Sequence, residues 1–335
     1  MNNLGLVVIG RNEGDRLKTC LLSAIDRVKN IVYVDSGSSD ESLELARSLG
    51  IDTVELDLTI PFTAARARNE GFTRLLGINP EIEFVQFVDG DCEIVTDWLE
   101  TALFELRASE DLAVVCGRRR ERFPQRSIYN LLCDLEWNTP IGEAKACGGD
   151  AMMRVSAFER VGGFDSSLIA GEEPELCLRL RLQGWKVLRI NAEMTVHDAA
   201  MTKFPQWWNR TMRSGHGYAE GAWLHGRSPE KHWVKESKSI WFWGLVLPVW
   251  ILSLSCLTQG WGLSLLLAYP VLIYRIYSRK KLEIASQKAL IYGLFCAIGK
   301  FAQVQGQIKF YLAKLSDKQT SLIEYKTLAM DRGNK

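Results

Sequence analysis

Short apolar runs alternate with helix-like segments between residues 4 and 88 of the chain. Runs rich in valine, isoleucine and leucine cover residues 4–9, 31–34, 53–56 and 84–88. Helix-like patterning covers residues 16–28, 40–49 and 64–76, and Asp40 suits the N-cap of the second of these segments. This β-α-β-α order predicts an α/β fold with a mostly parallel sheet and helices on both faces.

Three of the predicted strands end in polar clusters, at residues 10–13, 35–38 and 89–91. Ligands of such folds bind at the carboxyl ends of the strands. In the last cluster Asp89 and Asp91 flank Gly90, and two carboxylates so close repel each other unless a positive charge lies between them. The chain has no G-x-G-x-x-G and no G-x-x-x-x-G-K-[ST] pattern, which disfavours dinucleotide-dependent oxidoreductases and P-loop enzymes.

The formal net charge of +1 hides a division of the chain into an acidic and a basic part. Residues 1–202 carry 22 Lys and Arg against 33 Asp and Glu, whereas residues 203–335 carry 19 against 7. The basic part is expected to meet an anionic surface, either a membrane or nucleic acid. The eight cysteines show no C-x-x-C pair and lie mostly in apolar runs, which predicts buried thiols in a reducing compartment.

Residues 239–277 are almost free of charge and predict a transmembrane helical hairpin. Two apolar halves of about 17–18 residues, near the lower limit for a spanning helix, flank a short link at residues 258–260. Basic residues precede the first half and close the second, so both ends are expected on the cytoplasmic side. Because these charges flank apolar spans instead of forming an exposed stripe, we expect membrane lipids and no nucleic acid as partner. A buried hairpin in a soluble domain is the alternative.

The apolar stretch at residues 289–299 is too short to span a membrane before Lys300. Apolar residues at helical spacing follow up to Leu315, which predicts a helix lying in the membrane interface. A third span is the alternative. The first apolar run, residues 4–9, is too short for the apolar region of an export signal.

Two further segments of the acidic part carry candidate site residues. A basic cluster covers residues 118–122, which we interpret as a solvated loop or a substrate loop. Gly149 lies in a Gly-Gly-Asp motif, and a predicted helix begins near Gly171 with Glu172, Glu173 and Glu175 in its first turn. The helix dipole favours anions there, which accounts for one or two of them.

Five motifs in order resemble the GT-A-fold glycosyltransferases of family 2, over roughly residues 4–200. They are VVIGRNEGDRL, VDSGSSDES, ARARNEGF, VDGD and GEEPELCLRLRLQGW. The resemblance implies a Rossmann-like GT-A domain that binds a nucleotide-diphosphate sugar. The implied contacts to this donor are Arg11, Asn12, Glu13, Asp35, Arg68, Asp89 and Gly149.

The same resemblance assigns the metal and the catalytic residues. A divalent cation, Mg²⁺ or Mn²⁺, would be bound by Asp91, with His197 as a further ligand. Members of this type invert the anomeric centre, and one carboxylate deprotonates the acceptor hydroxyl. The usual Glu-Asp pair is Glu172-Glu173 here, so the base is placed on Glu173. Because glutamate is one methylene longer than aspartate, Glu172 or Glu175 stays open for this role.

Downstream, Arg210 and Arg213 lie in an amphipathic segment that resembles the one before the membrane part of lipid-linked relatives. They are expected to pair with the diphosphate or an anionic lipid acceptor, or else to anchor an interfacial helix. The segment has no clean Q-x-x-R-W motif, which weakens a processive synthase interpretation.

The predicted organisation is a GT-A domain at residues 1–202 and an amphipathic interfacial segment at 203–238. The hairpin at 239–277 follows, and then an interfacial or re-entrant helix with a cytoplasmic tail at 278–335. We expect transfer of a sugar to a lipid-linked or growing glycan acceptor, at the inner (cytoplasmic) membrane with the catalytic domain facing the cytoplasm. Two alternatives stay open: a sugar nucleotidyltransferase, and a non-catalytic membrane scaffold of the same fold.

Overall fold

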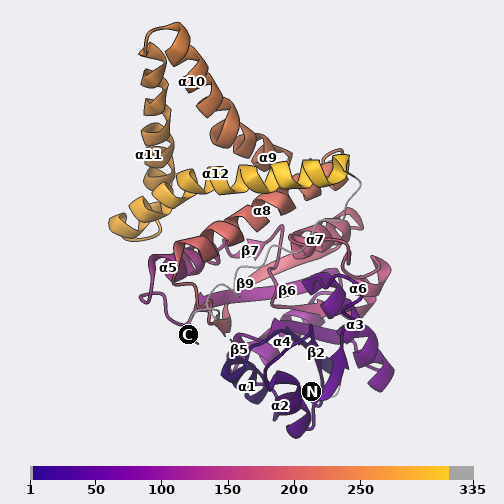
Figure 1. Ribbon diagram of the computed structural model, residues 1–335. Coiled ribbons are helices and arrows are strands. Elements are labelled where there is room, and N and C mark those ends of the chain that lie inside the picture. Colours follow the sequence, from indigo (N-terminus) through magenta and orange to yellow (C-terminus); the bar gives the residue numbers. More distant parts are fainter. Residues whose placement is uncertain (1–2, 317–335) are drawn as a thin grey trace. The chain divides into compact units, whose positions relative to one another are not determined.

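The computed structural model describes residues 3–316, and backbone contacts divide the chain after Thr202 into two compact units (Figure 1). The tail predicted for the end of the chain, from residue 317 on, lies outside the described residues. The first unit is a nine-stranded sheet with helices, and the second consists of helices.

The first half of the sheet follows the predicted β-α-β-α order. Its strands β1 (Leu4–Gly10), β2 (Asn30–Asp35), β3 (Asp52–Glu55) and β4 (Phe84–Asp89) are all parallel, in the order β3-β2-β1-β4. The intervening helices are α1 (Asp15–Leu22), α2 (Ser42–Ser48) and α3 (Ala64–Ile78). Gly71 of α3 packs against Val7 and Val34, where any larger side chain would overlap the two strands.

Two helix boundaries differ from the prediction. Helix α1 ends at Leu22 instead of residue 28, and the hydroxyl of Ser23 donates to the carbonyl of Cys20 at 2.6 Å just beyond that end. Helix α2 begins at Ser42, with Glu41 as its N-cap. The carboxylate of Asp40 accepts the Ser42 N–H at 3.1 Å, which is a local turn contact.

The second half of the sheet adds short antiparallel pairings to the parallel first half. Strand β8 (Ala151–Arg154) is antiparallel to β4 and to β6 (Leu112–Glu121), while β9 (Lys186–His197) is parallel to β6. The short strands β5 (Cys92–Ile94) and β7 (Gly142–Glu143) are antiparallel to β9.

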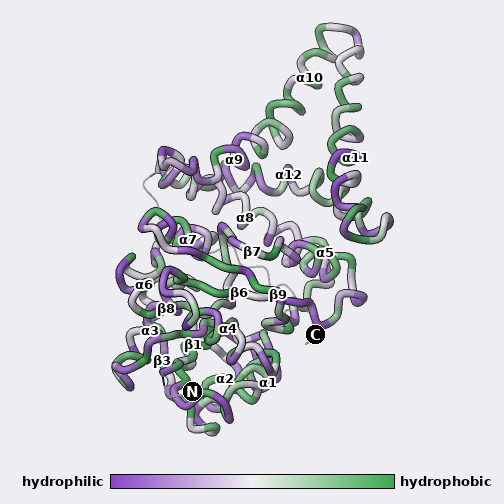
Figure 2. Tube along the Cα trace, turned by 180° about the vertical axis from the view of Figure 1, so that it is seen from behind, coloured by the Kyte–Doolittle hydropathy of each residue, from purple (hydrophilic) through white to green (hydrophobic). Residues whose placement is uncertain are grey.

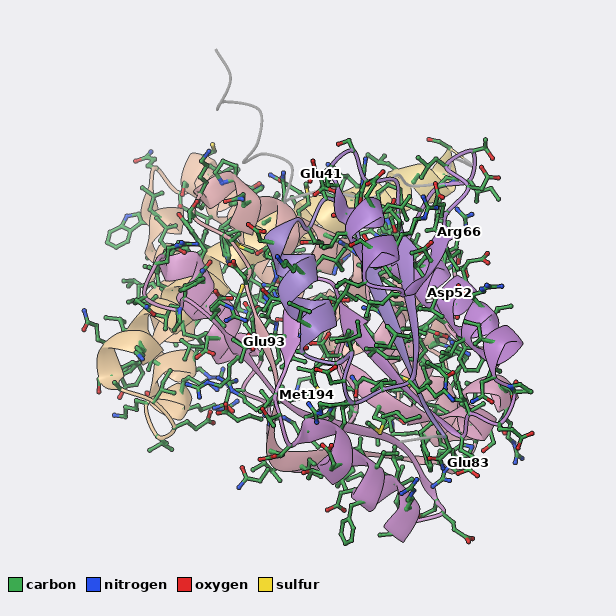
Figure 3. The ribbon with its side chains drawn as sticks, turned by 90° about the horizontal axis from the view of Figure 1, so that it is seen from below. Glu41, Asp52, Arg66, Glu83, Glu93 and Met194 are labelled. Atoms are coloured by element: carbon green, nitrogen blue, oxygen red, sulfur yellow. The ribbon has the colours of Figure 1, made fainter. Side chains whose placement is uncertain are left out.

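Helices α4 (Trp98–Ala108), α5 (Ile128–Glu136), α6 (Val155–Arg160) and α7 (Glu172–Leu182) complete the first unit. Its core includes Phe87, whose ring centroid lies 5.4 Å from those of Phe158 and Phe164. Met194 of β9 is buried, whereas the charged Glu41 and Glu83 are exposed (Figure 3). The sheet therefore has a continuous apolar interior that fixes the ends of its strands.

The basic cluster at residues 118–122 is not a loop. It extends along β6 and one residue beyond it, and its arginines pair with acidic residues far away in the chain. Arg118 contacts Asp134, and Arg120 contacts Glu193 at 2.7 Å. These pairs neutralise the cluster, so it does not form a free basic surface.

The second unit contains α8 (Phe204–His225), α9 (Val234–Trp241), the π-helical η1 (Phe242–Val246), α10 (Leu247–Leu257), the 3-10 helix η2 (Trp261–Leu267), α11 (Ala268–Lys280) and α12 (Ser286–Leu315). Hydrophobic residues run along both α10 and α11 (Figure 2). Among the described residues, one helix is long and apolar enough to cross a membrane, Val234–Leu257, and 22% of its apolar window is buried. The second predicted span is divided between η2 and α11.

Helix α12 includes both the apolar stretch at residues 289–299 and the helical pattern that follows it. It is one continuous helix of 30 residues that includes Lys300. Gly215 of α8 lies against the backbone of Gln303, and Gly306 of α12 lies against the backbone of Met212. This packing leaves no room for a β-carbon at either glycine. The close contact with α8 stabilises α12 along the part that contains polar residues.

Candidate active site

The guanidinium of Arg68 is the centre of a carboxylate cluster at the carboxyl end of β4. Its Nη2 donates to Asp89 at 2.8 Å and its Nη1 donates to Glu172 at 2.9 Å, while Glu173 Oε1 lies 3.6 Å away. Arg68 is only 2% exposed. Burial alone would lower the pKa of Arg68, but the carboxylates of Asp89, Glu173 and Glu172 together raise it, so the side chain stays cationic.

Gly149 lies in the middle of this cluster. A β-carbon at this position would be 2.7 Å from Arg68 Nη2, 2.9 Å from Asp89 Oδ2 and 3.1 Å from Glu173 Oε1. Only a residue without a side chain leaves this space open. The structure thus brings together five of the predicted site residues, from α3, β4, α7 and the loop before β8.

The two glutamates at the start of α7 differ in their surroundings. Gly171 precedes them with φ 84°, a left-handed conformation that favours glycine. Glu172 is bonded to Arg68 and its side chain is 6% exposed, whereas that of Glu173 is 16% exposed. Burial, and next the charge of Glu172, raise the pKa of Glu173 to about 7, and Arg68 opposes this rise. Glu173 is therefore able to exchange a proton near neutral pH.

Sequence reasoning missed a second set of contacts on the other side of Asp89. Arg119 of β6 lies 3.2 Å from Asp89 and 2.7 Å from the fully buried Asp150. Asp150 also accepts the Asp89 N–H at 3.0 Å and the Thr195 hydroxyl at 2.6 Å. Asp150 closes the Gly-Gly-Asp motif, which is the one sequence signal for it. Nothing in the sequence pairs it with Arg119.

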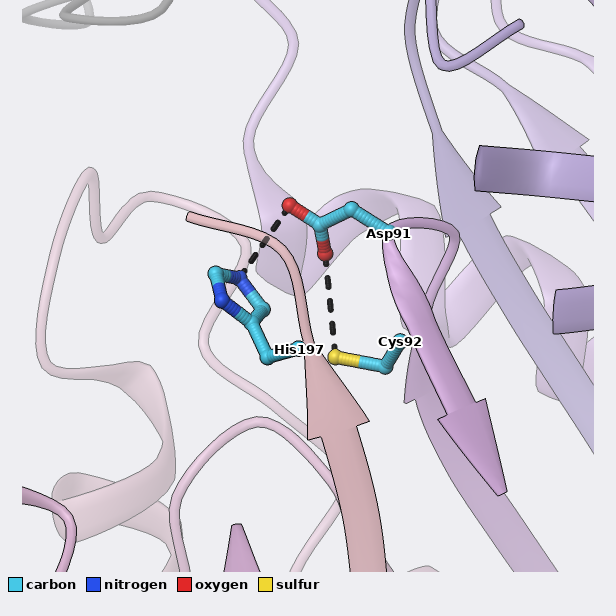
Figure 4. Close-up of side chains that lie close together, drawn as sticks. All are labelled: Asp91, Cys92 and His197. Atoms are coloured by element: carbon cyan, nitrogen blue, oxygen red, sulfur yellow. Dashed lines mark hydrogen bonds and ion pairs between the residues drawn. The ribbon is translucent and has the colours of Figure 1, made fainter. Parts of the chain in front are cut away.

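Asp91 and His197, the predicted metal ligands, lie side by side (Figure 4). Strand β5 pairs with β9 in a register that sets Cys92 opposite His197. The Nε2 atom of His197 is 3.1 Å from Asp91 Oδ2, and both residues are buried. Burial would lower the pKa of His197, but the charge and hydrogen bond of Asp91 raise it.

Cys92 is the third group close to these two, with Sγ 3.7 Å from Asp91 Oδ1. Burial is the main reason that the pKa of its thiol is raised well above the ordinary value, so Cys92 remains a thiol that donates to Asp91. A carboxylate and an imidazole are thus the donors at this place. They fit a divalent cation that takes its remaining ligands from phosphate oxygens or water.

Hydrogen bonds join the polar loops that follow β1 and β2. The side-chain oxygen of Asn12 accepts the Ser39 N–H at 2.7 Å, and Asp35 Oδ2 accepts the N–H groups of Gly37 and Ser38 at 2.9 and 2.8 Å. The register sets Gly10 beside Asp35 and Ile9 beside Asp89. The three predicted strand-end clusters therefore lie along one edge of the sheet.

Arg11 and Glu13 belong to the same edge. The Arg11 guanidinium lies 4.8 Å from the ring centroid of Phe62, and the buried Glu13 pairs with Arg16 at 2.8 Å. Arg210 and Arg213 are both half-buried on α8 of the second unit, and they are not among the residues that the first unit brings together.

Comparison with known proteins gives consistent matches. Residues 6–162 match the family model described as glycosyl transferase family 2. The succinoglycan biosynthesis protein ExoA of Rhizobium meliloti (strain 1021) is 24% identical over 253 residues, which cover 70% of this chain and 76% of that protein.

Two solved structures share the fold at low sequence identity. One is the mannosyltransferase PcManGT from Pyrobaculum calidifontis in complex with GDP-Man and Mn²⁺, with a TM-score of 0.57, 16% identity and coverage of 93% of this chain and 88% of that chain. The other is S. aureus TarS 1-349, with a TM-score of 0.50, 15% identity and coverage of 92% of both chains.

Proposed function

Because residues 6–162 match the family model of glycosyl transferase family 2, we propose that the chain is an inverting, metal-dependent glycosyltransferase of this family. Its donor is a nucleotide-diphosphate sugar, and its acceptor is a lipid-linked or growing glycan at the cytoplasmic face of a membrane. The observation that carries this proposal is the convergence of Arg68, Asp89, Glu172 and Glu173 around Gly149.

Glu173 is the general base in this proposal. A base works best when its pKa is near the working pH, and burial and Glu172 raise the pKa of Glu173 to about 7. Glu172 is held by Arg68 at 2.9 Å and is less exposed than Glu173, so it is less accessible to an acceptor hydroxyl. Its charge instead supports the raised pKa of Glu173 and keeps Arg68 oriented.

Asp91 and His197 are the proposed ligands of the divalent cation. When bound, the cation neutralises the charge that develops on the leaving diphosphate. One imidazole donor favours Mn²⁺ over Mg²⁺, because Mg²⁺ prefers oxygen ligands. The Mn²⁺ in the complex of the Pyrobaculum neighbour supports the presence of a divalent cation.

The nucleotide is proposed to lie along the edge formed by the ends of β1, β2 and β4. Asn12 and Asp35 fix the two loops there, since their side-chain oxygens accept backbone N–H groups. Arg11 is exposed and cationic, which suits a contact with the donor. Glu13 lines the same edge below Gly90, and its side chain lies 3.5 Å from the position of a β-carbon there.

A membrane acceptor is proposed because of the second unit. The helix Val234–Leu257 is apolar with 22% of its apolar window buried, and exposed apolar residues such as Leu263 and Val271 follow it. Basic residues precede and follow this region, as expected at the cytoplasmic side of the inner membrane. Arg210 and Arg213 are proposed to bind an anionic group of the donor or the lipid acceptor. The relative named for succinoglycan biosynthesis supports a polysaccharide or glycolipid product.

The test is release of nucleoside diphosphate from a panel of nucleotide sugars by the detergent-solubilised full chain, with Asp91→Asn as the comparison. We expect one donor to be cleaved with Mn²⁺ or Mg²⁺, and the variant to be inactive. If no donor is cleaved with any metal, even in the presence of membrane lipid extract, the proposal fails. That result would favour a non-catalytic membrane scaffold. A requirement for a nucleoside triphosphate and a sugar phosphate would indicate a nucleotidyltransferase.

A further inference from the structure

Glu121, the last residue of β6, is a buried carboxylate with an unusual set of partners. Its side chain is not exposed to solvent. One oxygen accepts from Phe123 N at 3.1 Å and Asn130 Nδ2 at 2.9 Å, and the other accepts from Ala199 N at 3.1 Å. Within residues 3–316, no lysine or arginine forms an ion pair with it. The imidazole of His197 lies beside it, with Nδ1 3.7 Å from Glu121 Oε2.

Burial of a carboxylate is strongly unfavourable unless donors or a cation compensate its charge. Three neutral N–H donors provide part of this compensation. The imidazole of His197, with Nδ1 at 3.7 Å, can supply the rest, because it can carry positive charge or be polarised by the carboxylate. The negative charge of Glu121 therefore lies on the Nδ1 side of the His197 imidazole.

His197 is enclosed between two carboxylates and an aromatic ring. Its Nε2 is 3.1 Å from Asp91 Oδ2, and its Nδ1 is buried without a hydrogen bond in the described part of the chain. The ring of Trp137 meets it edge to face, with centroids 4.7 Å apart. The imidazole cannot turn without leaving these contacts, so each ring nitrogen has a defined neighbour.

We propose that Glu121 is a positioning residue that orients His197 for the divalent cation. This inference rests on the proposed function and deepens its metal site. Glu121 accepts the Nδ1–H of His197, after an approach of less than 1 Å from the 3.7 Å separation. The proton is thereby held on Nδ1, and the lone pair of Nε2 faces the position shared with Asp91. Carboxylate–histidine pairs of this kind orient metal-binding histidines in general and raise their basicity.

The position of Glu121 is itself fixed from two sides. Asn130 belongs to α5, and Ala199 follows His197 by two residues, so the same short segment carries the histidine and a donor to Glu121. Arg122 N also donates to the His197 carbonyl at 2.8 Å. These backbone contacts hold Glu121 and His197 in fixed positions relative to each other. A positioning role for Glu121 requires such a fixed arrangement.

The competing explanation is purely structural: a protonated His197 bridges Asp91 and Glu121 and binds no metal. The two explanations differ in what Glu121→Gln does. This substitution keeps the size of the side chain and removes its charge. If Glu121 orients a metal ligand, Mn²⁺ affinity falls by about 10- to 100-fold, the range found when such outer carboxylates are replaced. If Glu121 only bridges, the melting temperature falls and Mn²⁺ affinity does not change.

The measurement is Mn²⁺ binding to the full chain in detergent. The electron paramagnetic resonance signal of free Mn²⁺ reports how much of the ion is unbound. Asp134→Asn is the matched control, because Asp134 accepts the Glu121 N–H at 3.1 Å and pairs with Arg118 but does not face His197. We expect this control to bind Mn²⁺ like the wild type, and His197→Ala to lose at least as much affinity as Glu121→Gln. Should Glu121→Gln fail to fold, Glu121→Asp shortens the same contact and is expected to weaken Mn²⁺ binding in the same direction.

Wild-type Mn²⁺ affinity in Glu121→Gln, or an equal loss in Asp134→Asn, overturns the inference while leaving the proposed function intact. A wild-type protein that binds no Mn²⁺, even with nucleoside diphosphates present, overturns both.

Discussion

Arg68 and Glu172 are 104 positions apart in the chain, and a hydrogen bond of 2.9 Å joins their side chains. This bond ties the start of α7 to α3 and leaves Glu173 as the more exposed of the two glutamates. The assignment of the base to Glu173 follows from this difference, and it has kinetic consequences.

Glu172→Gln is expected to lower the pH at which transfer begins. The charge of Glu172 raises the pKa of Glu173, so its removal lowers that pKa. In the wild type, kcat/KM should rise with pH through about 7, because the base must be deprotonated. In the variant this rise of kcat/KM should occur at lower pH, while transfer persists. If the rise, measured from pH 5 to 9, stays at the same pH, Glu173 is not the titrating group.

Glu173→Gln is expected to stabilise the fold at high pH. The pKa of Glu173 is raised in the folded protein, so its contribution to stability is fully present below the ordinary value of 4.5 and is lost as pH rises through about 7. Glutamine removes this penalty. The melting temperature of the variant should exceed that of the wild type at pH 8, by about 2–4 °C for each kcal/mol recovered, and the two should converge near pH 4. A lower melting temperature for the variant at pH 8 would contradict the raised pKa.

Gly149→Ala is expected to reduce transfer by at least tenfold. The new methyl group would lie 2.7 Å from Arg68 Nη2, so the guanidinium must move away from Asp89 and Glu173. Gly77→Ala is the matched control, because nothing lies within 4 Å of a β-carbon at that position in α3. The control should keep full activity and gain up to about 1 kcal/mol of stability. Equal activities in the two variants would show that the space at Gly149 is not needed.

Val249→Lys combined with Leu252→Lys is expected to release the protein from membranes. Both residues are exposed within the helix Val234–Leu257, at 47% and 67%. Each lysine near the centre of a spanning helix costs about 2.5–3.5 kcal/mol on insertion scales. Phe104→Lys is the control, since Phe104 is 71% exposed but lies on α4 of the first unit. Cell fractionation checks this, and an equal membrane fraction for the double variant and the control would argue against insertion.

The GT-A fold was predictable from the resemblance of five motifs in order, and the first half of the sheet from local pattern. Each apolar run of the first four strands is short and ends in polar residues, and a helical period follows each of the first three. The mixed second half was not predictable in this way. Strand β7 has two residues and β5 has three, and neither carries a pattern that sets its partner.

The same distinction applies to the candidate site, where motifs predicted some residues and strand pairing determines the others. Motif order allowed Asp89, Asp91, Arg68 and the α7 glutamates to be named. The structure added the contacts of Arg119 and Asp150, because these depend on the pairing of β6 with β8 and β9. A basic run such as residues 118–122 has the composition of a surface loop. Its place in β6 and the acidic partners of its arginines show that it belongs to the sheet.

The central claim is that Glu173 deprotonates an acceptor hydroxyl so that a sugar moves from a nucleotide donor to a membrane glycan. Its most direct test is the incorporation of labelled sugar from the cleaved donor into a membrane lipid extract, with Mn²⁺, by wild type and Glu173→Gln. We predict a product of inverted anomeric configuration from the wild type, and a rate lower by about 10²- to 10⁴-fold in the variant with donor binding unchanged. Incorporation by Glu173→Gln at the wild-type rate would contradict the account.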